Sequence, residues 1–288
     1  GRETGIRIRV THFKLRGRRN WGNARRHLDT IDRARGEGID IGIAQYPYTA
    51  NSTFMHVVVP PWYHSRGVDG LLRALREERG AIKHDLDTRM DWENFSQSVG
   101  WEKIFVSSVV SEANQPCVGK SISQIAAERG HADPADAAFD LLVEEQLAVG
   151  MISFGLDEAD ITAIMRHPAV SFITDGLMSG RPHPRAYATY PRILGRYVRE
   201  QGVLSLEEAV RKMTSLPARK IRLRNKGVIA EGYDADLVVF DPDTVIDKNS
   251  YDDPRVHPAG IRHVLVNGVF VVEDAALTGA RPGRVIRD

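Results

Sequence analysis

Hydrophobic and polar residues alternate with a period of two at the start of the chain. Residues 6–13 follow this pattern, which is typical of a strand. Residues 20–36 then repeat apolar side chains at helical spacing and end on Gly36, and residues 39–46 form a second, mostly apolar run. A strand, a helix and a strand in this order predict a parallel sheet.

The middle of the chain is less regular and then returns to clear elements. Residues 50–100 hold a predicted helix at 67–79 and a polar segment, and such a length between strands indicates an insertion at about residues 53–100. Beyond it, the pattern predicts strands at 103–110 and 170–174, and helices at 121–130, 134–148, 157–166, 184–202 and 206–213.

The character of the pattern changes after Gly227, where short β segments replace helices. Residues 235–240 are predicted to be a strand, and residues 264–272 a hairpin. Asn267-Gly268 lies at the turn and is a strong short-range hairpin signal. The tail is therefore predicted to be a small β unit.

Composition excludes several classes of protein. The 288 residues carry a net charge of +1, without the basic surplus of a nucleic-acid binder. The single cysteine, Cys117, cannot form an intrachain disulfide, which fits a reducing compartment, and we expect a cytoplasmic protein. No run of 18 apolar residues is present, so we expect no membrane span.

Two short segments place chemically active side chains at predicted strand ends. His12 and Lys14 would point to the same side of the first strand. Asp175 follows the apolar run 170–174 and precedes Gly176. Such an aspartate can be a metal ligand, a general base or a turn former. Residue types alone favour the structural interpretation for both segments.

Three further residues are candidates for ligand binding. Tyr46 ends the second predicted strand, Ser52 follows it, and Arg185 lies at the start of the predicted helix 184–202, next to Pro184. Arginine binds carboxylates with two hydrogen bonds, although a surface arginine is the simpler reading. The ten histidines form no His-x-His or His-Glu-x-x-His pair, and the chain has no Gly-x-Ser-x-Gly elbow.

Taken in order, these segments resemble the D-aminoacylase (N-acyl-D-amino-acid deacylase) branch of the metal-dependent amidohydrolases. The resemblance runs from residue 6 to the end. It is carried by Val10-Thr11-His12-Phe13-Lys14, Asn20-Trp21-Gly22, Tyr46-Pro47-Tyr48-Thr49-Ala50-Asn51-Ser52, Thr174-Asp175-Gly176, Arg181-Pro182-His183-Pro184-Arg185, Tyr190-Pro191-Arg192-Ile193-Leu194-Gly195, Gly232-Tyr233-Asp234-Ala235-Asp236-Leu237-Val238-Val239-Phe240, Val266-Asn267-Gly268 and Gly279-Ala280-Arg281-Pro282-Gly283-Arg284.

The resemblance implies an α/β fold in which this chain is the C-terminal part of a TIM-like (β/α)8 barrel with an inserted segment. Residues 1–222 would hold the late barrel strands and helices, and residues 223–288 part of a small β-sandwich. It implies hydrolysis of N-acyl-D-amino acids with one or two zinc ions. His12 and Asp175 match metal positions, and Asp175 also matches the residue that handles the proton of the attacking water. The positions that hold the substrate carboxylate match Lys14, Tyr46, Ser52 and Arg185.

The chain departs from the family pattern in its metal ligands. The His-x-His of the first barrel strand, a second-strand Cys or Glu, and a histidine one strand before His12 are all missing. We therefore expect this chain alone to be inactive, with a separate N-terminal half or self-association covering exposed apolar barrel surface. The alternatives are a cyclic-amide hydrolase of the dihydroorotase or hydantoinase type, and a non-catalytic remnant or scaffold subunit.

Overall fold

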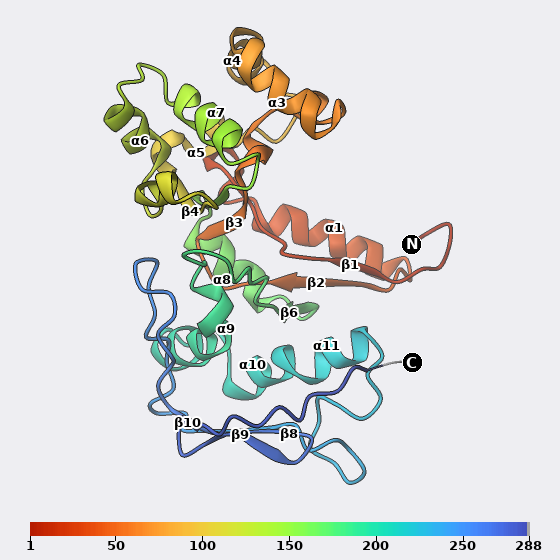
Figure 1. The fold of residues 1–288 in the computed structure, drawn as a ribbon. Helices are drawn as coiled ribbons and strands as arrows, with labels where there is room; N and C mark the ends of the chain where they lie inside the picture. Colours follow the sequence, from red (N-terminus) through yellow and green to blue (C-terminus); the bar gives the residue numbers. More distant parts are fainter. Residues whose placement is uncertain (287–288) are drawn as a thin grey trace.

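A short parallel sheet forms the first body of the chain. The computed structural model describes residues 1–286. Strands β1 (Ile8–Val10), β2 (Ile41–Gln45) and β6 (Val170–Phe172) pair in the order β1-β2-β6, and both pairings are parallel (Figure 1). This confirms the parallel arrangement predicted from the strand-helix-strand pattern.

Strand β1 is shorter than the predicted strand at 6–13. His12 has a φ of 39°, in the left-handed region, which interrupts the extended backbone directly after the strand. Pairing resumes one residue later, where the Phe13 N–H donates to the Ala44 carbonyl oxygen at 2.8 Å. The first strand therefore ends in a sharp turn at the sheet edge.

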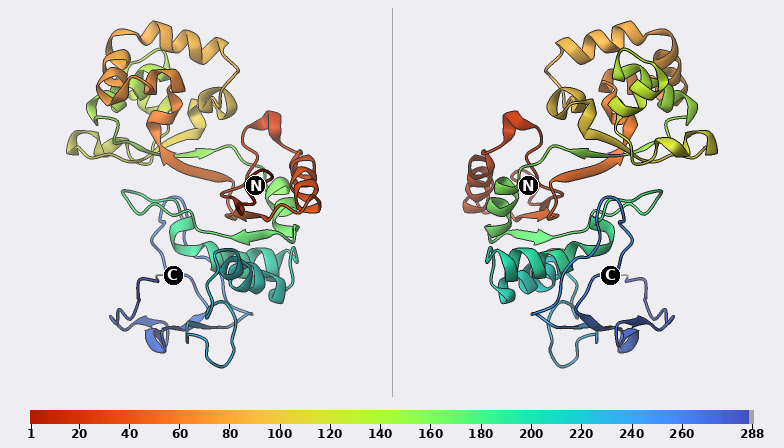
Figure 2. Two further views of the ribbon diagram at one scale, coloured as in Figure 1. Left: turned by 90° about the vertical axis from the view of Figure 1, so that its right-hand side faces the viewer. Right: turned by 90° about the vertical axis from the view of Figure 1, so that its left-hand side faces the viewer.

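Helices cover this sheet and separate it from the tail. Helices α10 and α11 lie between β6 and the tail sheet in Figures 1 and 2. A hydrophobic cluster that includes Ile43, Met165, Phe172 and Tyr197 fills the space between sheet and helices. The helical elements of this body are η1 (Arg18–Asn20), α1 (Ala24–Gly36), α8 (Glu158–Arg166), α9 (Arg185–Arg192), the π-helix η5 (Ile193–Glu200), α10 (Leu206–Met213) and α11 (Ser215–Lys220).

A second body with its own core lies between β2 and β6. Its strands β3 (Ala50–Phe54), β4 (Ile104–Ser108) and β5 (Gly150–Phe154) form an antiparallel sheet in the order β3-β5-β4. The helices around it are η2 (Met55–Val58), α2 (Pro61–His64), α3 (Gly67–Glu77), α4 (Arg79–Thr88), α5 (Phe95–Val99), η3 (Trp101–Lys103), η4 (Glu112–Cys117), α6 (Ile122–Arg129) and α7 (Pro134–Glu144).

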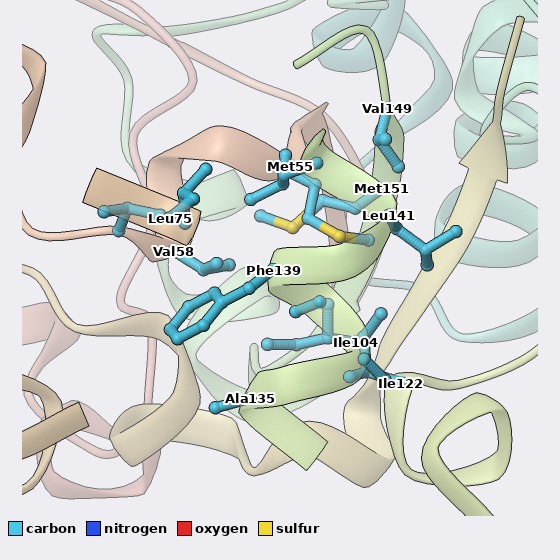
Figure 3. Close-up of a cluster of buried hydrophobic side chains, with 14 of the residues drawn as sticks. Met55, Val58, Leu75, Ile104, Ile122, Ala135, Phe139, Leu141, Val149 and Met151 are labelled. Carbon is cyan, nitrogen blue, oxygen red and sulfur yellow. The ribbon is translucent and has the colours of Figure 1, made fainter. Parts of the chain in front are cut away.

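This second body extends well past the expected insertion at about residues 53–100. Its hydrophobic cluster runs from Met55 to Met151 and centres on side chains such as Phe139 (Figure 3). Because β3 pairs with β5 across about a hundred residues of chain, the segment between them closes on itself. Hydrophobic periodicity predicted β4 and the helices α3, α6 and α7 of this body but neither β3 nor β5, and it does not show which strands pair.

One carboxylate ties the end of α7 to the loop that follows β4. Glu145 is buried and accepts hydrogen bonds from the N–H groups of Val110 (2.6 Å) and Ser111 (3.0 Å) and from Asn114 Nδ2 (2.7 Å). Burial alone would raise the pKa of Glu145, but these hydrogen bonds outweigh it and lower the pKa to about 2.

We expect Glu145→Gln to lower the free energy of unfolding by about 1–3 kcal/mol, because it removes charge-assisted hydrogen bonds in a buried setting. Since the folded pKa lies below the unfolded value, the contribution of Glu145 is present above about pH 4.5 and is lost as the pH falls towards 2. Denaturant unfolding at pH 7 and pH 3 measures both effects. Glu144→Gln, next to it and half-exposed, is the control and should change stability by less than about 0.5 kcal/mol.

The tail forms a single antiparallel sheet. Strands β7 (Leu237–Phe240), β8 (Ile261–Val266), β9 (Val269–Glu273) and β10 (Ala276–Leu277) pair in the order β10-β9-β8-β7. Asn267 and Gly268 have φ values of 49° and 79° at the turn between β8 and β9, which confirms the predicted hairpin. No helix within residues 1–286 combines the length and apolar character needed to cross a bilayer.

Candidate active site

A cavity of about 950 Å³ lies between the parallel sheet and the second body. Its wall includes residues that follow β1, β2 and β6, together with β3 and the start of α9. Parallel strands place their carboxyl ends at one edge of the sheet, which is where (β/α) proteins carry their active sites. Six residues predicted from the sequence share this wall: His12, Lys14, Tyr46, Ser52, Asp175 and Arg185.

Two of these residues have an uncommon backbone conformation. The φ angles of His12 and Asp175 are 39° and 48°, and each residue lies two or three positions after the end of a parallel strand. Left-handed backbone at a residue other than glycine costs free energy and tends to occur at functional sites. Both side chains line the cavity as a result of these turns.

Lys14 lies directly beside His12. Its Nζ is 3.0 Å from His12 Nδ1 and donates to the His12 carbonyl oxygen at 3.1 Å. The same Nζ lies 5.6 Å from the centroid of the Tyr46 ring. Burial lowers the pKa of Lys14 to about 8, with Asp175 acting in the opposite direction. The sequence predicted His12 and Lys14 on the first strand, but both residues lie just after β1. Their side chains are nevertheless in contact.

Arg185 occupies the centre of the site and is 1% exposed. Its Nη2 lies 2.9 Å from Asp175 Oδ2 and donates to the Ser52 carbonyl oxygen at 3.2 Å. The guanidinium also stacks over the Tyr46 ring, 4.4 Å from its centroid. Within the described residues, Arg185 Nε and Nη1 make no hydrogen bond. A buried guanidinium with unused donors is suited to bind an anionic group.

Tyr46 supplies a neutral donor at the same place. Burial raises the pKa of its hydroxyl, so the hydroxyl stays protonated at physiological pH. Among residues 1–286, the hydroxyl group has no hydrogen-bond partner. Tyr46, Lys14 and Arg185 all line the same cavity.

His183 is a buried residue that the sequence analysis did not assign to the site. Its Nδ1 accepts from the Arg185 N–H at 3.0 Å, and its Nε2 donates to the Ala50 carbonyl oxygen at 3.1 Å. Burial, followed by the nearby Arg185, keeps its pKa well below the usual value, so the ring is neutral. His183 therefore links β3 to the start of α9 and holds Arg185 in place. The sequence signal was the segment Arg181-Pro182-His183-Pro184-Arg185, which belongs to the family resemblance.

Arg16 and Glu93 also line the cavity without having been predicted. Arg16 Nη2 lies 2.9 Å from Glu93 Oε1, and the guanidinium carbon lies 3.2 Å from the centroid of the Phe95 ring. Glu93 comes from the second body, about eighty residues away from Arg16 in the sequence. No local pattern marks such a pair.

The donors present do not complete a metal site. His12 and Asp175 are the two candidate ligands, and each already contacts a cation, Lys14 or Arg185. Catalytic zinc sites use three protein ligands. Within the described residues, no group of three or more His, Cys, Asp or Glu side chains is arranged to hold a metal ion. A tightly bound ion would need ligands from elsewhere.

The chain is therefore an α/β protein with a strand-end cavity lined by two cationic side chains, Lys14 and Arg185, and an adjacent carboxylate. A model described as amidohydrolase family matches residues 115–272, more than half of the chain, and the chain belongs to this family.

Two curated proteins and one solved structure are similar to this chain over its full length or nearly so. The chain is 37% identical to an N-acyl-D-glutamate deacylase of Alcaligenes xylosoxydans xylosoxydans, over all of this chain and 49% of that protein. It is 34% identical to a D-aminoacylase of the same organism, over 99% of this chain and 50% of that protein. The structure of N-acyl-D-glutamate deacylase from Bordetella bronchiseptica, complexed with zinc and a phosphonate inhibitor, is similar with a TM-score of 0.79. It is 34% identical, and the match covers all of this chain and 51% of that one.

The chain spans about half the length of the curated relatives it matches, and the match lies in their C-terminal part. The predicted family is confirmed by these similarities. The roles of individual side chains are not, because the similarities concern the chain as a whole.

Proposed function

We propose that this chain carries the substrate-binding and proton-transfer part of an N-acyl-D-amino-acid deacylase. The reaction is hydrolysis of a linear amide, which gives a carboxylate and a D-amino acid. One observation carries the proposal: Lys14, Tyr46 and Arg185 present donors to one cavity in which Asp175 lies 2.9 Å from Arg185. The relatives are deacylases of N-acyl-D-amino acids by name.

In this proposal, the free carboxylate of the substrate binds to the cationic side of the cavity. Arg185 supplies a positive charge at the cavity wall; its Nη2 already contacts Asp175 and the Ser52 carbonyl oxygen, and its Nε and Nη1 make no hydrogen bond within residues 1–286. Lys14 adds a second positive charge, and the hydroxyls of Tyr46 and Ser52 add neutral donors. Fixing one end of a small substrate orients the scissile amide at the other end.

Asp175 is the proposed proton carrier. Its carboxylate accepts a proton from the attacking water as the new C–O bond forms at the amide carbon. It then returns that proton to the nitrogen as the C–N bond breaks, so the amine leaves neutral. The ion pair with Arg185 and the left-handed backbone hold the carboxylate at the cavity wall.

The complete enzyme is proposed to contain zinc, with His12 and Asp175 as the donors from this chain. The remaining ligands would come from a separate N-terminal half or from another copy of the chain. The small β1-β2-β6 sheet would then be one side of a TIM-like barrel, and the tail sheet one layer of a β-sandwich. Domain limits at 1–222 and 223–288 and a cytoplasmic location complete the proposal.

Arg185→Met tests the binding role directly. We expect this variant to bind N-acetyl-D-methionine roughly 10- to 150-fold more weakly, because charge-assisted hydrogen bonds contribute about 1.5–3 kcal/mol. Isothermal titration calorimetry on the 288-residue chain measures the dissociation constant.

The matched control is Arg181→Met in the same loop. Arg181 pairs with the exposed Asp252 and does not line the cavity, so its variant should bind like the unchanged chain. Lys14→Met is a second test in case Arg185→Met fails to fold. Unchanged affinity in both folded Lys14 and Arg185 variants would contradict the proposed function.

A further inference from the structure

A loop of the tail reaches the segment that carries Arg185. Residues 247–258 lie between β7 and β8, and an isolated bridge between Ile246 and Ala259 closes the base of this loop. In both views of Figure 2 the loop, in blue, extends from the tail sheet towards the rest of the chain. We call residues 247–258 the tail loop, and residues 180–185, which end where α9 begins, the arginine loop.

Side chains of the tail loop bind the backbone of the arginine loop near both of its ends. Asn249 Nδ2 donates to the Pro184 carbonyl oxygen at 2.9 Å and to the Pro254 carbonyl oxygen of its own loop at 3.0 Å. Arg255 Nη2 donates to the Gly180 carbonyl oxygen at 2.7 Å. The two loops are therefore joined by side chain to backbone hydrogen bonds.

The peptide unit before the Arg185 side chain is held from two sides. The Pro184 carbonyl and the Arg185 N–H belong to the same planar peptide. Asn249 binds the carbonyl oxygen of this peptide, and His183 Nδ1 accepts from its N–H at 3.0 Å. Because both polar groups of the peptide are bound, its orientation is fixed, and with it the direction in which the Arg185 side chain leaves the backbone.

The tail loop also packs against the His183 ring. The Tyr251 ring lies edge-on to the His183 ring, with centroids 5.1 Å apart, and the Tyr48 ring lies edge-on to it at 5.0 Å. Tyr251 in turn contacts Phe154, with ring centroids 4.7 Å apart. Such packing restricts rotation of the histidine ring and keeps its Nδ1 beside the Arg185 N–H.

A partly buried ion pair joins the start of the tail loop to α9. Arg192 Nη1 lies 2.7 Å from Asp247 Oδ2, and the two side chains are 18% and 10% exposed. Arg192 Nε also donates to the carbonyl oxygen of Pro47, the residue after Tyr46, at 2.9 Å. The tail loop is therefore connected to the helix that begins with Arg185 and to the segment that carries Tyr46.

A further ion pair between the two loops is exposed. Arg181 pairs with Asp252, whose side chain is 95% exposed. Exposed ion pairs contribute about 0–1 kcal/mol, so this pair adds little to the position of the arginine loop. The contacts of Asn249 and Tyr251 carry the argument instead.

We propose that the tail loop positions Arg185 in the cavity and that Asn249 is its main positioning residue. The inference rests on the proposed function, in which Arg185 binds the substrate carboxylate. A group that holds the substrate loses much of its effect when it is misplaced by about 1 Å, so control of this peptide affects binding. The tail would thus support the site although none of its described residues lines the cavity.

Asn249→Leu tests this role, because it removes two hydrogen bonds without adding charge. Calorimetry measures the Kd of N-acetyl-D-methionine and of N-acetyl-D-methioninamide, which lacks the carboxylate. The unchanged chain should bind the carboxylate form at least ~10-fold more tightly. Asn249→Leu should lower this preference by roughly 3- to 10-fold, the range for one or two lost hydrogen bonds. Hydrogen exchange of the Arg185 amide, measured by NMR without ligand, should become at least ~3-fold faster.

Asn23→Leu is the matched control. Asn23 Nδ2 also donates to two carbonyl oxygens, those of Asn20 and Trp21 at 3.2 and 3.3 Å, but Asn23 does not line the cavity. This variant loses a similar set of contacts far from the arginine loop in the sequence. It should keep both the carboxylate preference and the exchange rate of the Arg185 amide.

A pair of Tyr251 variants provides the test if Asn249→Leu does not fold. Tyr251→Leu removes the ring beside His183 and should lower the carboxylate preference. Tyr251→Phe keeps the ring and should keep the preference.

Every other outcome decides against one of the two claims. A folded Asn249→Leu variant with unchanged carboxylate preference would overturn the inference and leave the proposed function standing, whether or not the Arg185 amide exchanges faster. An equal loss of preference in Asn23→Leu would overturn it as well, because the effect would then follow stability. If the unchanged chain binds neither ligand, the proposed function fails, and the exchange rate of the Arg185 amide alone decides whether the tail loop positions this residue.

Discussion

The purified 288-residue chain is expected to bind N-acetyl-D-methionine but to release no D-methionine from it above the uncatalysed background. The reason is the metal site. Within residues 1–286, the proposed zinc donors are His12 and Asp175, fewer than the three protein ligands of a catalytic zinc site. Both donors already contact cationic side chains, Lys14 and Arg185, and these positive charges oppose the approach of a zinc ion. Ninhydrin-type detection of the free amine and metal analysis after dialysis against zinc measure both parts.

The informative comparison adds the polypeptide encoded directly upstream of this chain, either fused to it or mixed with it as a separate purified polypeptide. Deacylation and tightly bound zinc that appear only in the combined sample would support a divided metal site. Measurable turnover by the chain alone would refute the expectation. Substrate binding without turnover in either sample would favour a non-catalytic role for the chain.

Asp175→Asn is expected to separate binding from chemistry. The variant should bind N-acetyl-D-methionine at least as tightly as the unchanged chain, because it removes a negative charge 2.9 Å from Arg185, where the substrate carboxylate would bind. In the active combined sample, the same change should lower kcat by roughly 10²–10⁴, the range for loss of a general acid-base group. Calorimetry gives the affinity, and steady-state kinetics give kcat.

Asp252→Asn is the matched control, because Asp252 is an exposed partner of Arg181. It should change neither binding nor turnover. A Asp175→Asn variant that keeps its full kcat would remove Asp175 from the proton-transfer role. A variant that loses affinity instead would show that Asp175 orients Arg185 rather than acting on the substrate amide.

The site is assembled from segments that are far apart in the chain. Arg185 reaches the Ser52 carbonyl oxygen across 133 residues, and His183 reaches Ala50 across the same separation. Both contacts join the start of α9 and the loop before it to β3, the strand that opens the second body. The second body therefore contributes to the binding site as well as forming its own core, which connects its packing to the position of Arg185.

Local sequence pattern was sufficient for much of the fold. The alternation across β1, the apolar runs at β2 and β6 and the Asn267-Gly268 turn each reflect interactions between residues close in the chain. His12, Asp175 and Arg185 also stand at or near predicted strand or helix ends, although the family resemblance, and not residue type, marked them as site candidates. These features depend on backbone geometry within a few residues.

The sequence by itself therefore determined the α/β class and many of the strands and helices, and its family resemblance pointed to the six candidate side chains. Only the tertiary structure decided that β3 pairs with β5, that the second body runs to Met151, and that His183 and the Arg16–Glu93 pair belong to the cavity. The physical reason is the separation along the sequence between the residues that interact. Periodicity and turn chemistry act over a few residues, whereas strand pairing and the burial of charge depend on contacts between segments a hundred residues apart.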